Sequence, residues 1–288
     1  MTRWRWIGAI LIISLLGIAG LVNFDGPEPN NGSLVPAPDT LGLVFVRIAA
    51  GSFKMGSNDH EEKERPVHIV KISKAFDIGK YEVTQRQWTK VMGTEPWMGK
   101  QYAQTNDQAP AMYISWDDTQ SFLGRLNAGD KNFKYRLPTE AEWAYSAKAG
   151  QDTRYSGTSE PDSLCLYGNV SDDSAKKAFP KWITTNCDDG HAWASPVGQF
   201  RPNAWGIYDM TGNVWEWVQD RNGPYPSGSV VDPAGPVTGR FRVLRGNSFD
   251  AFASLDPRDD VARLSNRFFV LPDRRSILFG FRIVRESK

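Results

Sequence analysis

The chain has 288 residues, of which 40% are hydrophobic and 23% are charged, so it is long enough for one large domain or two small ones. Its formal net charge of +1 gives no indication of a nucleic-acid partner. The 26 glycines, 18 prolines and 11 tryptophans come with few long periodic runs. This composition favours an irregular, loop-rich fold and argues against a helix bundle or a doubly wound sheet.

The first 22 residues have the pattern of a targeting segment. Two arginines and two tryptophans precede residues 7–22, which form an uncharged apolar run. This run is shorter than the roughly 20 residues of a transmembrane helix, and it also fits the apolar region of a signal peptide. Two alternatives stay open: a signal anchor that crosses the inner membrane through residues 4–22 and faces the periplasm, or a cleaved signal that leaves a periplasmic or secreted protein.

Residues 23–40 are rich in proline, glycine and asparagine and have little to bury. Such a composition is typical of a flexible tether. We therefore expect one folded domain over residues 41–288.

Four strands are predicted at the start of this domain. Residues 43–48 and 51–56 alternate in polarity and predict a hairpin with Gly51 at the turn. Residues 67–72 and 76–83 predict two further strands, because they show the same alternation.

Three helices follow, each after a polar residue that can cap it. A cap side chain accepts a hydrogen bond from an otherwise unpaired amide of the first turn. In the third helix Glu142 can return a bond to the cap, which makes a capping box. The predicted caps are Thr84, before a helix that carries Trp88, Val91 and Met92; Ser115, before residues 116–126; and Thr139, before residues 140–149.

Regular periodicity nearly disappears after residue 150. It returns in residues 242–246 and 280–284, which predict the last strands. The region between is expected to be loop held together by its tryptophans, because each ring covers a large area with few rotatable bonds.

Cys165 and Cys187 are the only cysteines. In an exported chain they are a candidate disulfide, which would close a loop of roughly 20 residues and contribute about 3 kcal/mol in the loop-entropy model. Two buried free thiols are the alternative.

The most informative motif is residues 203–217, which place three tryptophans, a tyrosine, two asparagines, an aspartate and a glutamate around two glycines. With six other motifs in order, it resembles the formylglycine-generating enzyme and sulfatase-modifying-factor family over roughly Val44 to Arg285. The resemblance implies a single irregular α+β domain of C-type-lectin-like type. The other motifs are residues 48–56, 80–84, 114–118, 135–143, 242–249 and 280–282.

The resemblance also implies two calcium ions. Calcium takes six to eight oxygen ligands in irregular geometry, which suits loop carbonyls. If Asn169 and Asp189 share an ion, Cys165 and Cys187 lie near each other, which favours the disulfide. The first site would use Asn169, the Val170 carbonyl, Asp189 and the His191 carbonyl, and the second would use Asp209, the Gly212 and Val214 carbonyls and Glu216.

The family's oxidase holds copper with two thiolates, five residues apart, soon after an Arg-Gly-Gly-Ser turn. That turn corresponds here to residues 245–248, so the thiolate positions fall on Ala251 and Asp256. A methyl group coordinates nothing, and a carboxylate is too hard a ligand for Cu(I). We therefore predict no catalytic residue of the oxidase type and expect no copper.

By family position the acid- and arginine-rich residues 249–275 would line a substrate groove, with Ser248 and Arg263 as its most transferable members. A solvated, salt-bridged loop is the alternative.

Three functions stay open, in order of preference. The first is an exported, calcium-stabilised binding or regulatory accessory protein with a protein or peptide partner outside the inner membrane, such as a secretion or signalling component. The second is an enzyme of divergent chemistry that matures a peptide or siderophore, and the third is a formylglycine-generating oxidase.

Overall fold

The computed structural model describes residues 38–252, 256 and 260–288, which belong to one compact unit. The predicted targeting segment and most of the predicted tether lie outside these residues. Within the part that is described, no helix is long and apolar enough to cross a membrane.

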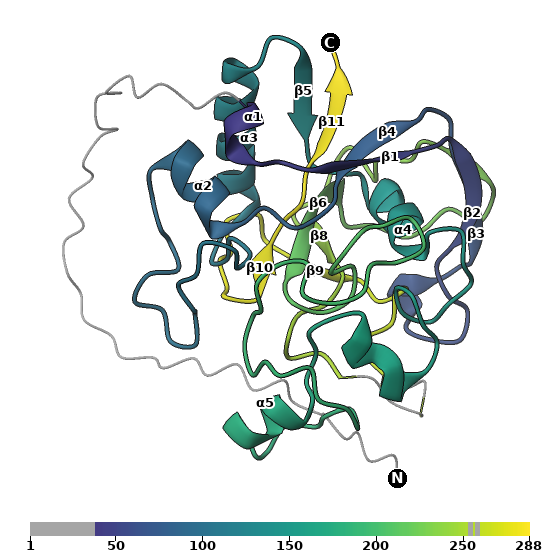
Figure 1. Ribbon diagram of the computed structural model, residues 1–288. Coiled ribbons are helices and arrows are strands. Elements are labelled where there is room, and N and C mark those ends of the chain that lie inside the picture. The colour runs from purple at the N-terminus through teal and green to yellow at the C-terminus, as the bar shows by residue number, and fades with distance from the viewer. Residues whose placement is uncertain (1–37, 253–255, 257–259) are drawn as a thin grey trace, which may run out of the picture. The chain divides into compact units, whose positions relative to one another are not determined.

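The first four strands form a bent antiparallel ribbon. β1 (Phe45–Ile48) pairs with β4 (Phe76–Gly79), and β2 (Gly51–Met55) pairs with β3 (His68–Ile72). β1 and β2 lie in different sheets, so the predicted hairpin between them is wrong. The chain instead bends at residues 49–50 and carries the ribbon from one sheet into the next (Figure 1).

Gly51 shows why the hairpin prediction failed. Its backbone does not adopt a left-handed turn, and a Cβ there would overlap the hydroxyl group of Tyr145. The glycine therefore permits close packing between two elements, which a sequence pattern cannot distinguish from a turn. The strand predicted over residues 67–72 is confirmed, whereas the strand predicted over residues 76–83 ends at Gly79.

Three sheets organise the described chain. The first has the order β1-β4-β11-β5, with β11 over Val284–Ser287 and β5 over Phe133–Arg136. The second has the order β10-β6-β8-β9, over Phe279–Gly280, Trp215–Arg221, Arg242–Arg245 and Phe268–Val270. The third adds the two residues of β7 (Val230–Val231) to β3.

The second sheet confirms one predicted strand, contradicts another and contains one strand that was not predicted. β8 confirms the strand predicted over residues 242–246. The strand predicted over residues 280–284 is wrong, because β10 ends at Gly280 and β11 begins at Val284, in another sheet. β6 was not predicted: Glu216 and Asp220 are buried on it together with Trp217, so the strand lacks the polar–apolar alternation of a half-buried one.

The helices α2 (Gln85–Met92), α3 (Trp116–Gly129) and α4 (Glu140–Lys148) begin at the predicted caps, and each has a complete capping box. α3 continues beyond its predicted end at Leu126. Among the described residues there are four further short elements: α1 (Pro38–Leu41), which includes the end of the predicted tether, α5 (Asp173–Ala178), and the 3-10 helices η1 (Glu62–Glu64) and η2 (Pro161–Leu166).

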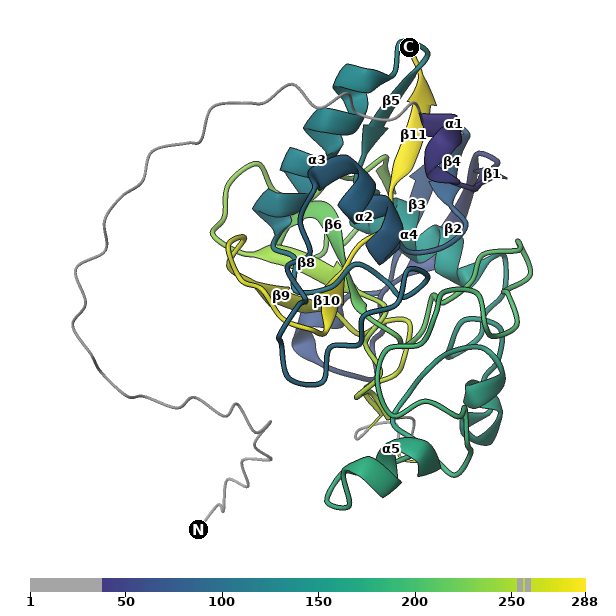
Figure 2. The ribbon, with the colours of Figure 1, turned by 60° about the vertical axis from the view of Figure 1, so that its left-hand side comes forward.

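α4 connects two of the sheets. It contacts β2 and β3 on one side and β6 and β8 on the other. Its Trp143 and the Trp217 of β6 are among the largest fully buried side chains. The loop-rich chain between α4 and β6 includes η2 and α5 and lies in the lower part of both views (Figures 1 and 2). It carries most of the predicted calcium ligands. Figure 2 shows α5 at its lower tip.

Candidate functional site

The two predicted calcium loops lie directly against each other. The amide of Asn213 donates to the Asn169 carbonyl at 2.8 Å. A Cβ at Gly212 would overlap that same carbonyl oxygen, and a Cβ at Gly168 would overlap the carbonyl oxygen of Thr211. Only glycine fits such a backbone-to-backbone approach. The two predicted sites therefore form one continuous unit.

The structure brings the four residues of the first predicted site together. The Asp189 carboxylate accepts hydrogen bonds from the amides of Val170 and His191, both at 2.8 Å. Asn169 is fully buried, and its side-chain nitrogen donates to the Trp193 carbonyl at 2.8 Å. Its side-chain oxygen, Oδ1, is buried without a hydrogen-bond partner. A buried oxygen in this state is costly unless something else binds it.

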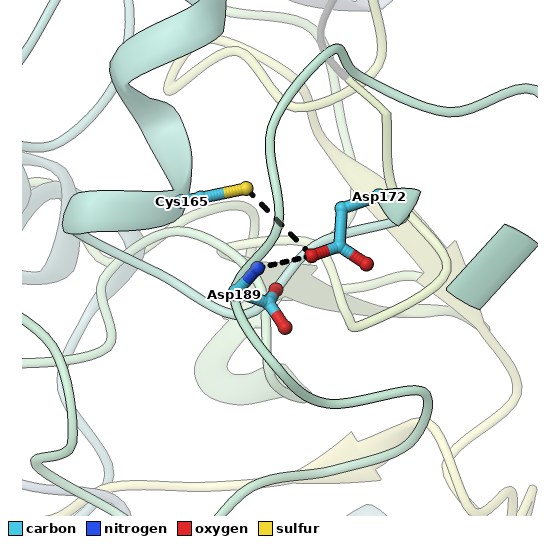
Figure 3. A group of neighbouring side chains, drawn as sticks. All are labelled: Cys165, Asp172 and Asp189. Atoms are coloured by element: carbon cyan, nitrogen blue, oxygen red, sulfur yellow. Dashed lines mark hydrogen bonds between the residues drawn. The ribbon is translucent and has the colours of Figure 1, made fainter. Parts of the chain in front are cut away.

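Asp172 belongs to the same site and was not predicted. One of its oxygens caps α5 by accepting from the Ala175 amide at 3.0 Å, and the other accepts from the Asp189 amide (Figure 3). Burial, together with the nearby charge of Asp172, raises the pKa of Asp189 to about 8. A cap residue before a short helix was the only signal in the sequence, and it does not indicate a second carboxylate at this place.

Cys165 and Cys187 form a disulfide, as predicted, with 6.1 Å between their Cα atoms. Sγ of Cys165 lies 3.8 Å from Oδ2 of Asp172, next to Asp189 (Figure 3). A disulfide sulfur carries no proton and is not a thiolate, so this group of residues does not fit a soft metal ion. Its carboxylate oxygens suit a hard cation instead.

The predicted second site contains a buried ion pair. Glu216 accepts from the Arg282 guanidinium with both oxygens, each at 2.6 Å, and from the Trp143 ring nitrogen at 2.8 Å. A carboxylate offers about four acceptor positions, so one position is left on Oε1. Oδ2 of Asp209 accepts from the Gly198 amide at 2.7 Å, while its Oδ1 is buried without a partner.

Glu82 adds a third buried carboxylate beside Asp209 and Glu216. Its Oε2 accepts from the Asn213 side chain at 3.1 Å, and its Oε1 is buried without a partner. Burial first, and then repulsion from Asp209 and Glu216, raise the pKa of Glu82 well above its ordinary value. Burial likewise raises the pKa of Asp209 to about 6. The cluster therefore places three carboxyl groups beside the single guanidinium of Arg282, and without a cation it favours holding a proton.

The sequence contained one signal for Glu82 that the prediction did not use. A glutamate that lies between Tyr81 and Val83, directly before a capped helix, is a candidate for burial.

The predicted copper positions do not fit copper. Ala251 is buried in an apolar cluster with Tyr155 and Val170, and Asp256 is half-buried. The two sulfurs of the cysteines are used by the disulfide, so the residues present supply no thiolate pair for Cu(I).

The two predicted groove residues have different surroundings. Ser248 is fully buried and donates to Oδ1 of Asp250 at 2.6 Å. Arg263 is buried in a bidentate pair with Glu64, with a shortest distance of 3.0 Å. Arg263 lines a cavity of about 150 Å³, and Ser248 is not among the residues that line it.

Known proteins with similar sequences include two bacterial formylglycine-generating enzymes and a protein named as a chaperone. The formylglycine-generating enzyme of Streptomyces coelicolor is 36% identical over 181 residues, which is 62% of this chain and 53% of the enzyme, so the match spans about half of that relative. The enzyme of the same name from Thermomonospora curvata is 30% identical over 302 residues, covering 85% of this chain and 94% of the enzyme. "Chaperone protein LppX" of Paenibacillus barcinonensis is 28% identical over 74% of this chain and 80% of its own length.

Solved structures share the fold. Treponema denticola variable protein 1 superimposes with a TM-score of 0.68 at 26% identity, over 83% of this chain and 94% of that one. PvdO from Pseudomonas aeruginosa gives a TM-score of 0.66 at 29% identity, over 84% and 94%. A family model described as "Sulfatase-modifying factor enzyme 1-like domain" matches residues 32–287. The chain therefore belongs to the family of sulfatase-modifying factor enzyme 1-like domains.

Proposed function

We propose that this chain is an exported accessory or binding domain of its family, stabilised by two calcium ions and without the copper oxidase activity. It would serve a protein or peptide partner outside the inner membrane. The observation that carries the proposal is the use of both cysteines in one disulfide, with Ala251 packed in an apolar cluster where the first thiolate is expected.

Calcium is supported by the oxygens that lack partners. Asn169 Oδ1 and Asp209 Oδ1, the first side-chain ligands expected at the two sites, are both buried without a hydrogen bond, as is Glu82 Oε1. A divalent cation would satisfy such oxygens and neutralise the excess negative charge. The residues that would hold the ions are Asn169, the Val170 carbonyl, Asp189 and the His191 carbonyl at the first site, and Asp209, the Gly212 and Val214 carbonyls and Glu216 at the second.

An accessory role is supported by sequence similarity as well as by the chemistry of the residues. One relative that matches over most of its length is named a chaperone protein. The calcium ions would neutralise and cross-link the loop region, which leaves the loops' outer surface available for a partner.

The calcium arm of the test uses Asp209, because Glu216 also holds Arg282 and its removal would destabilise the fold with or without calcium. Calcium added to the chelated full chain at about 100 times its Kd should raise the Tm by roughly 5–10 °C. Asp209→Ala should lose much of this rise, and the exposed control Asp152→Ala should keep it. Equal rises in all three proteins, or no rise in the wild type, would contradict the calcium proposal.

The copper arm of the same experiment measures Cu(I) binding and aldehyde formation on a Cys-x-Pro-x-Arg peptide. We expect neither, with the disulfide intact or reduced, because the two cysteines are not at the family's thiolate positions. Stoichiometric tight binding of Cu(I), or formation of the aldehyde, would overturn the assignment as a non-oxidase.

A further inference from the structure

A cavity of about 150 Å³ lies away from the predicted calcium ligands. It is formed by the end of β2 and the loop after it, by the C-terminal half of α4, and by the chain that follows β8. A water molecule needs roughly 10–15 Å³ of such space, so the cavity has room for a small organic molecule. Of the predicted site residues, only Arg263 is among those that line it.

The polar side of the cavity carries basic side chains. Four of its lining residues are Lys148, Arg154, Arg245 and Arg263, and the described residues that line it include no aspartate or glutamate. The acids that hold these arginines do not line the cavity. Arg263 pairs with Glu64 at 3.0 Å, and Arg154 pairs with an aspartate at 2.7 Å. Arg245 also lies 3.6 Å from Glu140, and Lys148 pairs with Asp152 at 3.2 Å. These pairs fix the basic groups in place and offset part of their charge, while the basic side chains themselves line the cavity.

Three nitrogens on the lining side chains have no hydrogen-bond partner. They are Nη2 of Arg154, Nε of Arg245 and Nδ1 of His60, and all three are buried. Arg245 is only 2% exposed, and its other nitrogens are used by backbone carbonyls, the closest being that of Leu264 at 2.6 Å. Buried polar groups without partners are rare because they are costly, and these come from three separate segments around one cavity.

The opposite side of the cavity is apolar. Phe53, Met55, Ala144 and Leu264 line it, and they offer packing surface but no hydrogen bonds. A bare phosphate or sulfate ion would use the basic side only. A molecule that joins a carboxylate to a short apolar group uses both sides, in the manner of most small-molecule sites.

We propose that this cavity binds a small organic carboxylate, with its oxygens toward Arg154 and Arg245 and its apolar group against Phe53 and Met55. Planar guanidinium groups match carboxylate geometry and form strong, charge-assisted hydrogen bonds. The site goes beyond the proposed accessory function and depends neither on calcium nor on copper, so it can fail while that function holds.

The test is calorimetric titration of the full wild-type chain with sodium benzoate, with neutral benzamide and with inorganic phosphate. Benzoate should bind, while benzamide and phosphate should each bind at least about tenfold more weakly. Benzamide lacks the carboxylate, and phosphate lacks the apolar group. Benzamide binding as well as benzoate, phosphate binding as well as benzoate, or no benzoate binding would each overturn the proposal. This comparison needs no variant.

Two arginine variants test whether benzoate binds in this cavity. Arg154→Gln should weaken benzoate binding by about tenfold or more, since it removes a charge and an unused donor from the lining. Arg242→Gln is the matched control: its Nε is also buried without a partner, but the side chain lies over the Trp116 ring, outside the cavity. Equal loss in both variants, or no loss in Arg154→Gln, would overturn the assignment to this cavity.

Carboxylates of this kind occur as free small molecules and as the C-termini of peptides. A short peptide that ends in leucine, compared with its C-terminally amidated form, separates the two sources. Binding of the free acid peptide at least as tight as that of benzoate, together with loss on amidation, would assign the site to a peptide terminus. Binding of benzoate without the peptide would assign it to a free metabolite, and both results support the carboxylate site.

Discussion

Asp220 illustrates how much of this protein's chemistry is decided by single buried residues. It lies on β6 and accepts a hydrogen bond from the Glu140 amide at the start of α4, at 2.8 Å. Glu140 itself is ionised against Arg267, at 2.6 Å. Burial, and then the charge of Glu140, raise the pKa of Asp220 to about 8. At neutral pH the folded state therefore holds a proton that the unfolded chain releases.

This proton makes the stability of the protein fall as the pH rises. Asp220 binds its proton more tightly in the folded state, so the contribution is fully present below the unfolded pKa of about 3.9 and is lost as the pH approaches about 8. Asp220→Asn keeps an oxygen for the Glu140 amide and cannot ionise. We expect it to raise the free energy of unfolding by an amount that grows between about pH 4 and pH 8, and that is larger near pH 8 than near pH 5 by about 1 kcal/mol or more.

Urea unfolding of the wild type and of Asp220→Asn across this pH range measures the effect. The exposed Asp152→Asn serves as the control and should follow the wild type at every pH. The same pH slope in all three proteins would show that Asp220 does not hold the proton.

At the residue scale the sequence was most informative where chemistry is local. Caps such as Thr84 and Ser115 were predicted because the cap bond joins residues three apart. Glu82 and Asp172 were missed because their significance comes from neighbours far along the chain: Asp209 for Glu82, and the Asp189 amide for Asp172. Burial of a carboxylate is a property of the folded chain, and a local pattern such as the apolar neighbours of Glu82 marks only a candidate.

At the scale of elements, the start of α4 is the most heavily connected of the three helix starts. Thr139 accepts from the Glu142 amide at 3.1 Å, and Glu142 returns a bond to the Thr139 amide at 2.8 Å. The same glutamate pairs with Arg136 of β5, with a shortest distance of 2.6 Å. The capping box thus fixes both the helix and the strand that precedes it.

We expect Thr139→Ala to lower the free energy of unfolding by about 1 kcal/mol, because the Glu142 amide loses its acceptor. For a chain of this size the Tm should fall by roughly 2–4 °C. Ser121→Ala, on the exposed face of α3, is the matched control and should change the stability by no more than a few tenths of a kcal/mol. A Tm for Thr139→Ala equal to that of the control would contradict the role of the box.

The elements also show where prediction from sequence stops. Helices were found because their period and caps are local, whereas strand pairing is set by distant segments. β1 and β2 follow each other in the chain yet pair with β4 and β3. β6 was read as a loop because acids and apolar residues are buried on it together.

At the scale of the whole molecule, the chain between α4 and β6 has little regular structure and depends on cross-links. The Cys165–Cys187 disulfide closes the loop of the first predicted site, over a sequence separation of 22 residues, and the loop of the second predicted site lies against it. Gly168 and Gly212 then allow the loops to meet backbone to backbone. The predicted calcium ligands sit on both sides of this contact. The disulfide could be predicted from the expected export and the number of cysteines, but the meeting of the loops could not.

The disulfide should therefore contribute to the stability of the whole domain, because it restricts the unfolded chain by joining two residues that are 22 positions apart. The double variant Cys165→Ala, Cys187→Ala should lower the free energy of unfolding by about 3 kcal/mol in the presence of a calcium chelator. The chelator matters, since calcium binding would otherwise hold the same loops and mask part of the loss. Urea unfolding measures the difference, and wild type treated with a reducing agent should shift by a similar amount. Unchanged unfolding in the variant would mean that the loop contacts alone hold this region, and that the disulfide closes a loop already closed by packing.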